Sequence, residues 1–476
     1  MIPSPRPNPA KRTTSDELLE AANQAEDFAS SSKHYHQRYR RIKLTAAASG
    51  LSRLVSFLTG IVSVPLMVKY LGTEQYALWA TIGSTMAFLG FADMGISNGL
   101  LNAISESDGA EDPEKAATYS STGFFLLLAM SVVIGAVFAV VYPYVPWARV
   151  FNVSTGAATK EAGPATAALV ACFLIYLPLT VAQRVQLGYQ RGYLNQCWEA
   201  AGNVFALGAL VCAIRWDMGL AVVVMALGGG PALSGFLNAL TLFGVQRPKL
   251  RPKFSKVSYP AGKRLITLGF FFVIIQLATA AAYQTDNLIL AQVLGASAVT
   301  GYAIPLKLFG FMPGIISLLL TPLWPAYSEA VARGDLVWVR KTLRYSVASV
   351  VAVSLVSSLA LALAAPTIIR IWVGEPLVPS VGLLLGMALW SALGSISGAL
   401  GIFLNGAGFI RIQAICSVLM ATVNVALSVF LTRRIGVPGV IYGTVISHTI
   451  FILIPYCYFL PGQLALLGKG KRYEFG

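Results

Sequence analysis

The chain has 476 residues, of which 56% are hydrophobic and only 12% are charged. Soluble globular domains carry roughly 25% charged residues, so this composition excludes an ordinary soluble protein and indicates one polytopic membrane domain. The formal net charge of +15 does not indicate nucleic-acid binding, because most basic residues flank apolar runs, where they set topology and contact lipid headgroups.

The first 43 residues form a polar, basic tail without the features of a cleavable signal peptide. Residues 1–13 are rich in proline and are expected to be disordered. Thr14 and Glu17 have the spacing of a capping box, which predicts a short helix from Thr14 to Phe28. The basic and aromatic segment 33–43 predicts an anchor at the cytoplasmic membrane surface.

After the tail, apolar runs of roughly 18 to 27 residues recur, each long enough to cross a bilayer as a helix. The expected fold is therefore an all-α polytopic membrane protein with about twelve transmembrane helices in two six-helix halves. The twelve predicted spans are 45–69, 76–103, 118–142, 164–187, 197–214, 219–244, 265–291, 297–323, 344–367, 379–404, 412–431 and 437–460.

The orientation follows from the distribution of lysine and arginine among the loops, because cytoplasmic loops carry an excess of these two residues. This distribution predicts that both termini are cytoplasmic, with Arg184 among the cytoplasmic basic residues. The longest cytoplasmic loop separates two sets of six spans. The predicted divisions are a tail (1–43), a first half (44–244), a basic linker (245–264), a second half (265–461) and a cytoplasmic tail (462–476).

A weak internal repeat links the two halves. Leu71-Gly72 matches Leu294-Gly295, and the segment from Tyr76 to Ala80 matches the segment from Val299 to Ala303, at a constant offset of 223 residues. Repeats of about half the chain are typical of transporters built from two related halves. Because each half has an even number of spans, the halves are expected to be related by an axis along the membrane normal.

The sequence offers little for catalysis or metal binding. The five cysteines are scattered and odd in number, and no catalytic, nucleotide or metal-binding motif occurs at useful spacing. We therefore expect neither an enzyme nor a protein with a cofactor or metal. Transport without a nucleotide site would use an ion gradient, with H⁺ and Na⁺ left open, or the gradient of the substrate itself.

Four charged residues lie inside predicted spans, where charge usually faces a bundle interior or a wet cavity. Arg53 and Asp93 lie at matching depths from the cytoplasmic side, and Asp286 and Lys307 lie nearer the outer side. Each pair is expected to lie close together. The pairs could be structural, or Arg53 and Lys307 could bind an anionic substrate while Asp93 and Asp286 tune them or couple an ion; snorkelling to the interface is a third interpretation.

Over residues 45–460 the chain resembles the Wzx-type polysaccharide flippases of the MATE-like (multidrug/oligosaccharidyl-lipid/polysaccharide, MOP) exporter superfamily. The residues that carry this resemblance are LGTEQYALWATI (71–82), FADMGISNGLLNAISE (91–106), YQTDNLILAQVLGASAVTGYA (283–303) and GIFLNGAGFIRIQAICSVLMATVNVALS (401–428). In the family, the positions that match Arg53 and Asp93 carry polar cavity residues. The residues themselves agree, because guanidinium binds phosphate in a bidentate manner.

The resemblance implies a transporter in the bacterial inner membrane that moves an undecaprenyl-diphosphate-linked oligosaccharide from the cytoplasmic to the periplasmic leaflet. Such transport serves O-antigen, capsule or exopolysaccharide synthesis by alternating access. Its expected partners are that lipid-linked substrate, membrane lipids and other polysaccharide assembly proteins. Two alternatives stay open: an ion-coupled small-molecule exporter of the same fold, and a non-transporting scaffold of an assembly complex.

Overall fold

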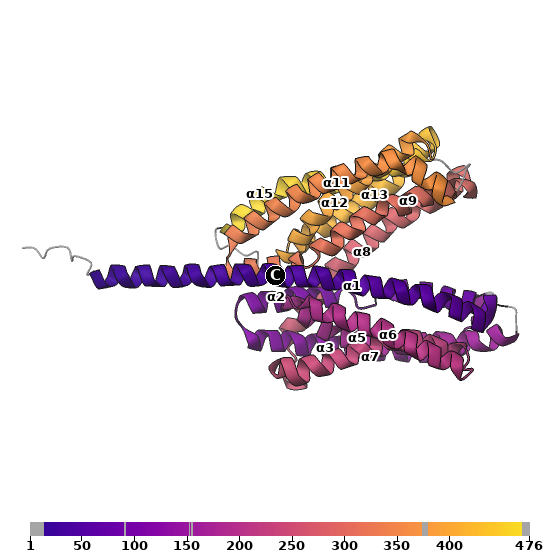
Figure 1. Cartoon of the computed structure of the whole chain (residues 1–476), viewed down its shortest axis with the longest axis horizontal. Helices are drawn as coiled ribbons and strands as arrows, with labels where there is room; N and C mark the ends of the chain where they lie inside the picture. Colours follow the sequence, from indigo (N-terminus) through magenta and orange to yellow (C-terminus); the bar gives the residue numbers. More distant parts are fainter. Residues whose placement is uncertain (1–13, 90–91, 152, 154–155, 374–378, 469–476) are drawn as a thin grey trace, which may run out of the picture.

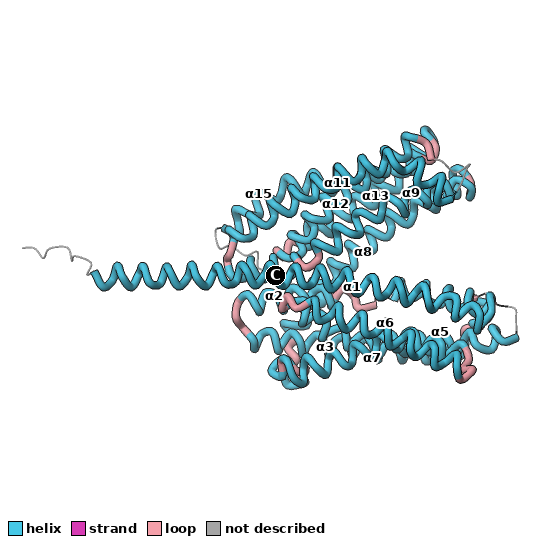
Figure 2. Tube along the Cα trace, viewed as in Figure 1, coloured by secondary structure: helices cyan, strands magenta, loops and turns pink. Residues whose placement is uncertain are grey.

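The computed structural model describes residues 14–89, 92–151, 153, 156–373 and 379–468, and the regular structure of these residues is entirely helical (Figure 2). The all-α prediction is confirmed. Predicted features of residues 1–13 and 469–476 lie outside the described residues.

The first half of the chain contains seven α-helices and short connecting turns. They are α1 (Thr14–Leu89), α2 (Ile96–Gly109), α3 (Pro113–Val141), α4 (Trp147–Val150), α5 (Gly156–Gly188), α6 (Gly192–Arg215) and α7 (Leu220–Thr241). A single π-helical turn, Leu242–Gln246, leads into the predicted linker, which continues through two 3₁₀ turns, Pro248–Leu250 and Phe254–Lys256.

The second half begins within the predicted linker, at Tyr259. Its helices are α8 (Tyr259–Leu294), α9 (Ala296–Leu320), α10 (Leu323–Arg333), α11 (Leu336–Val373), α12 (Val381–Gly406), α13 (Ile410–Ile435), α14 (Pro438–His448) and α15 (Ile454–Gly468). A π-helical turn, Thr449–Leu453, joins the last two.

Eleven helical segments of the described chain are long and apolar enough to cross a membrane. Each matches one predicted span, including the fifth and sixth, which a short turn separates. The remaining prediction, 76–103, contains residues 90–91 and so falls partly outside the described residues. The flanking parts belong to α1 and α2, which turn residues 92–95 separate.

Figure 1 shows two lobes, one built from α1 to α7 and the other from α8 to α15. The lobes meet around α2 and diverge toward the opposite end (Figure 1). Two short helices, α2 of the first lobe and α10 of the second, pack on each other at this meeting point. Each one follows a longer helix at the corresponding place in its half, so the contact between lobes joins related elements.

Small residues allow this close contact. Gly95, at the start of α2, lies against the backbone of Gly269 in α8, and a Cβ at either glycine would collide with the other segment. Gly109, at the end of α2, meets the Glu329 carbonyl in the same way. Side-chain hydrogen bonds continue the contact: Trp324 Nε1 donates to Asn102 Oδ1 at 2.6 Å. Bulkier residues at these glycines would hold the lobes apart.

Ion pairs surround the same contact. Arg264 of α8 pairs with Glu106 of α2 at 2.5 Å, and Arg333 of α10 pairs with Glu111, just after α2, at 2.7 Å. Because each pair joins one half to the other, the charges stabilise the arrangement in which this end is closed.

The polar tail differs from its prediction. The helix that begins at Thr14 does not end at Phe28 but continues as α1 into the first predicted span. Residues 29–43 contain neither proline nor glycine, so nothing there terminates a helix. The segment projects from the lobes at the end where they meet (Figure 1).

The base of this projecting segment is tied to the second half through Arg38, which is 3% exposed. Its guanidinium donates to Glu329 Oε2 at 2.6 Å and to Asp335 Oδ2 at 2.6 Å. The group also lies over the ring of Trp338, 5.0 Å from the ring centre. Although α1 packs mainly on α6 and α5, its N-terminal part therefore contacts α10 and α11.

Candidate functional site

The structure does not bring Arg53 and Asp93 together as the depth argument predicts. Arg53 is exposed on α1, and its electrostatic partner is Glu199 of α6. Asp93 lies in the turn before α2, where its Oδ1 accepts a hydrogen bond from the Gly95 N–H at 2.9 Å. Matching depth fixes the height of two residues but not the faces of their helices, so the predicted partner of Asp93 is wrong.

The second predicted pair is also separated. Asp286 of α8 is 2% exposed and accepts a hydrogen bond from the Tyr302 hydroxyl at 2.7 Å. Lys307 is exposed on α9, in an apolar groove of about 530 Å³ that residues of α9 and α11 line. The ion pairs of the described residues do not include Asp286 with Lys307.

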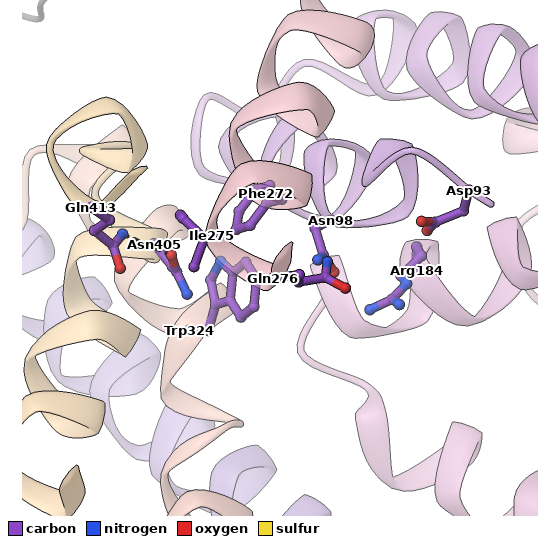
Figure 3. A pocket seen from close by; sticks show the side chains of 9 residues that line it. All are labelled: Asp93, Asn98, Arg184, Phe272, Ile275, Gln276, Trp324, Asn405 and Gln413. Carbon is purple, nitrogen blue, oxygen red and sulfur yellow. Dashed lines mark hydrogen bonds between the residues drawn. The ribbon is translucent and has the colours of Figure 1, made fainter. Parts of the chain in front are cut away.

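A cavity of about 360 Å³ lies where the two lobes meet, beside the α2–α10 contact (Figure 3). Both halves contribute to it. The lining residues are Asp93, Asn98, Arg184, Phe272, Ile275, Gln276, Trp324, Asn405 and Gln413. Of the four residues predicted from sequence, this cavity contains Asp93 but neither Arg53 nor Lys307 nor Asp286.

Arg184 is the cation of this lining. It lies on α5, and Figure 3 shows its guanidinium and the carboxylate of Asp93 on the same side of the cavity. The two groups interact electrostatically. The ion pairs of the described residues do not include Arg184. Its guanidinium N–H groups can therefore donate hydrogen bonds to a ligand that enters the cavity.

The opposite wall of the cavity is neutral and polar. Gln413 Nε2 donates to Asn405 Oδ1 at 2.8 Å, which fixes both amides at the edge of the second lobe (Figure 3). Trp324, Phe272 and Ile275 provide apolar surface between this edge and Arg184. The arrangement offers one fixed cation at one end and uncharged hydrogen-bonding groups at the other, which suits an anionic ligand with a polar neutral extension.

The sequence places Arg184 among the cytoplasmic basic residues, because it stands near the end of a predicted span. The signal that could have identified it is its position inside that span, 164–187, between two glutamines, Gln183 and Gln186. A polar triplet within an apolar helix indicates a face turned to water or to the protein interior.

A family model described as polysaccharide biosynthesis protein matches residues 45–331. The chain belongs to this family. The matched range covers the first half from residue 45 onward, the cavity residues from Asp93 to Trp324, all of α2, and α10 as far as residue 331.

Two relatives agree with this family. A protein of Salmonella typhi described as an O-antigen transporter is 24% identical over 61% of this chain and 66% of its own length. A protein of Yersinia pseudotuberculosis described as an O-antigen export protein is 23% identical over the same shares. The chain thus matches just under two thirds of the length of each relative.

Solved structures of MATE and MOP transporters share the fold. A multidrug resistance MATE family transporter in an outward-facing conformation aligns with a TM-score of 0.75 at 16% identity, covering 91% of this chain and 97% of that one. A MOP superfamily transporter from Pyrococcus furiosus aligns with a TM-score of 0.75 at 15% identity and the same coverage. The chain therefore has the MATE-like transporter fold.

Proposed function

We propose that this protein is a flippase that moves an undecaprenyl-diphosphate-linked oligosaccharide across the bacterial inner membrane for synthesis of a surface polysaccharide. The observation that carries the proposal is the cavity between the lobes, in which Arg184 and Asp93 are the charged residues and the rest of the lining is neutral, with both polar and apolar side chains. The family and the relatives support the same substrate class.

In this mechanism the Arg184 guanidinium binds the diphosphate, because its paired N–H groups match paired phosphoryl oxygens. Asp93 lies beside it and weakens its hold on the anion, so that the substrate is released after crossing. The lipid chain stays in the bilayer while the oligosaccharide passes through the wet cavity.

Access alternates as the two lobes rock about the α2–α10 contact. In the arrangement of Figure 1 this contact is closed by glycine packing and ion pairs, and the lobes diverge at the other end. We assign the closed end to the cytoplasm, with both termini on that side, because the basic loops lie there.

Arg53, Lys307 and Asp286, which lie outside this cavity, each have a separate role in the proposal. Arg53 would meet the diphosphate at the rim of the first lobe, and Lys307 would contact it from the membrane-facing groove of α9. Asp286 is the candidate for coupling to H⁺ or Na⁺, because one of its oxygens, Oδ1, is buried without a hydrogen-bond partner among the described residues. The protein would need no cofactor and would catalyse no covalent chemistry.

Complementation of a flippase-deficient strain, with surface polysaccharide as the readout, tests the proposal. Arg184→Ala should abolish export at equal expression, and Arg184→Lys should restore it only partly, because an ammonium cannot bind two oxygens in a fork. Arg53→Ala in the same assay shows whether the rim cation is also required.

Arg215→Ala is the control, because Arg215 is exposed at the end of α6 and lines no part of the cavity. Normal export by Arg184→Ala would remove the diphosphate role. Drug resistance conferred by the wild-type chain without any surface polysaccharide would favour a small-molecule exporter instead. Normal export by every charge variant would favour a scaffold.

A further inference from the structure

A second chamber, of about 310 Å³, opens inside the second lobe. It shares Ile275, Asn405 and Gln413 with the cavity that contains Arg184. The two spaces are therefore neighbours on either side of the Asn405–Gln413 amide pair. A ligand held at Arg184 can extend into the chamber past this pair.

The lining of the chamber contains no aspartate, glutamate, lysine or arginine. His448 belongs to it, and both ring nitrogens have partners: Nδ1 lies 3.2 Å from the Tyr283 hydroxyl and Nε2 lies 2.7 Å from the Ser397 hydroxyl. The imidazole is thus fixed in the wall. A chamber without fixed charge does not suit a diphosphate and suits an uncharged polar group.

Two hydroxyl groups in the chamber are left for a ligand. Ser417 is 8% exposed and Tyr456 is 5% exposed, and both side chains line the chamber. Within the described part of the chain neither hydroxyl has a hydrogen-bond partner. Neither oxygen is among the fully buried side-chain atoms of the described residues that lack a partner, so both hydroxyls keep surface that a ligand in the chamber can reach.

Glycines of α12 keep the chamber open. Gly394, Gly398 and Gly401 line it at helical spacing. A Cβ at Gly394 or Gly398 would meet no atom within 4 Å, so packing does not require glycine at these positions. Gly406 of the same helix differs, because its Cβ would lie 2.6 Å from the Trp324 carbonyl. Gly394 and Gly398 therefore preserve space rather than a helix contact.

We propose that this chamber binds a sugar ring of the lipid-linked oligosaccharide while the diphosphate stays at Arg184. A neutral sugar supplies donors and acceptors for the Ser417 and Tyr456 hydroxyls, and its apolar ring face fits the aromatic and aliphatic wall. The inference rests on the proposed function and adds the place where the sugar is recognised.

Binding of two lipids to the purified protein separates the sugar site from the diphosphate site. One probe is undecaprenyl diphosphate without sugar. The other is the lipid-linked repeat unit extracted from the flippase-deficient strain that the wild-type chain complements. Gly398→Leu, which fills the chamber, should weaken binding of the repeat-unit lipid by about tenfold or more and leave undecaprenyl diphosphate unchanged.

Two variants that add no volume test the chamber even where Gly398→Leu fails to fold. Ser417→Ala and Tyr456→Phe each remove one hydroxyl without adding volume, and each should weaken only the repeat-unit lipid, by roughly threefold to tenfold. Gly208→Leu in α6 is the matched control, because a Cβ there also meets no atom within 4 Å and the residue lines neither space. Arg184→Ala should weaken both lipids.

Equal affinities of the wild type and all three chamber variants for the repeat-unit lipid would overturn the sugar site while leaving the diphosphate site intact. Binding of ethidium that is lost in Gly398→Leu, with unchanged binding of the repeat-unit lipid, would assign the chamber to lipophilic cations and would also overturn it. A wild-type chain that binds neither lipid would instead defeat the proposed function.

Discussion

Gly72 and Gly295 adopt the same backbone conformation at equivalent places in the two halves. Their φ and ψ angles are 75° and 173° at Gly72 and 94° and 163° at Gly295. Each glycine joins the first long helix of its half to the second. Residues other than glycine essentially do not occupy this region of backbone conformation. The weak repeat in the sequence therefore marks a shared turn geometry.

Alanine at either glycine should be strained. We expect Gly72→Ala and Gly295→Ala each to lower the free energy of unfolding by about 1–3 kcal/mol, measured by thermal unfolding of the purified protein. Gly60→Ala is the control, because Gly60 lies within α1, where alanine favours the helix and a Cβ meets no atom within 4 Å. Equal stability of all three variants would show that the turn tolerates a side chain.

Loss of the ion pairs that Arg38 makes with Glu329 and Asp335 should shift the equilibrium between the closed and open arrangements of the α2–α10 end. Arg38→Ala removes both carboxylate contacts between α1 and the second half, so the α2–α10 end should open in a larger share of molecules. Spin labels at residues 115 and 337, both exposed on opposite lobes near this end, report the change as a new population at longer distance.

Arg40→Ala should leave that distance distribution unchanged, because Arg40 is exposed and lies two residues after Arg38 in the sequence. A distribution identical to the wild type in Arg38→Ala would mean that glycine packing and the remaining ion pairs hold the end closed without Arg38.

Acidic pH should stabilise the closed end through Asp108, which lies at the end of α2 beyond the spanning segments. Burial, together with Glu329, raises the pKa of Asp108 from its ordinary 3.8 to about 6, although Arg41, Arg333 and Arg247 oppose the rise. A carboxyl with a raised pKa binds more protons in the folded protein than in the unfolded chain. Its contribution to stability is therefore full below 3.8 and is lost as pH rises through about 6.

Asp108→Asn should remove this part of the pH dependence. We expect the difference in thermal stability between pH 5 and pH 7.5 to shrink in the variant, with stability at pH 7.5 raised toward the value at pH 5. An unchanged difference in Asp108→Asn would assign the pH dependence to another group.

Tyr302→Phe should destabilise the second lobe, because it removes the hydrogen bond to the buried Asp286 carboxylate. A loss of about 1–3 kcal/mol is expected from chemical denaturation. The same change in an Asp286→Asn background should cost less, because an amide leaves no buried charge behind. Tyr458→Phe is the control, since Tyr458 is 80% exposed. Equal costs in both backgrounds would exclude a specific Tyr302–Asp286 interaction.

Much of the fold follows from apolar periodicity and length alone. Eleven of the predicted spans recur as separate helices, and the matching pair of Gly72 and Gly295 was visible as a sequence repeat. These features depend on local sequence, because bilayer thickness sets span length and backbone sterics reserve the turn for glycine.

The site was harder to predict because it depends on which helix faces meet. Depth along the helices predicts Arg53 as the partner of Asp93, whereas the cation that lies beside Asp93 is Arg184 of α5. The chamber in the second lobe depends on which face of α12 carries its glycines. The ion pair between Arg38 and Glu329 depends on the tail continuing into the first span as one helix. Such relations arise from tertiary packing between distant segments, which a single sequence does not encode locally.

The uninterrupted start of α1 has a mechanical consequence. From Thr14 to the base at Arg38 the helix projects beyond the lobes (Figure 1), a rod of roughly 36 Å at 1.5 Å per residue. Rotation of the first lobe by about 10° would carry the tip of such a rod through roughly 6 Å. The tail is thus a lever arm that converts a small internal tilt into a displacement in the surrounding solution. A protein bound to the tip would be displaced by each tilt of the first lobe, and holding the tip in place would oppose that tilt.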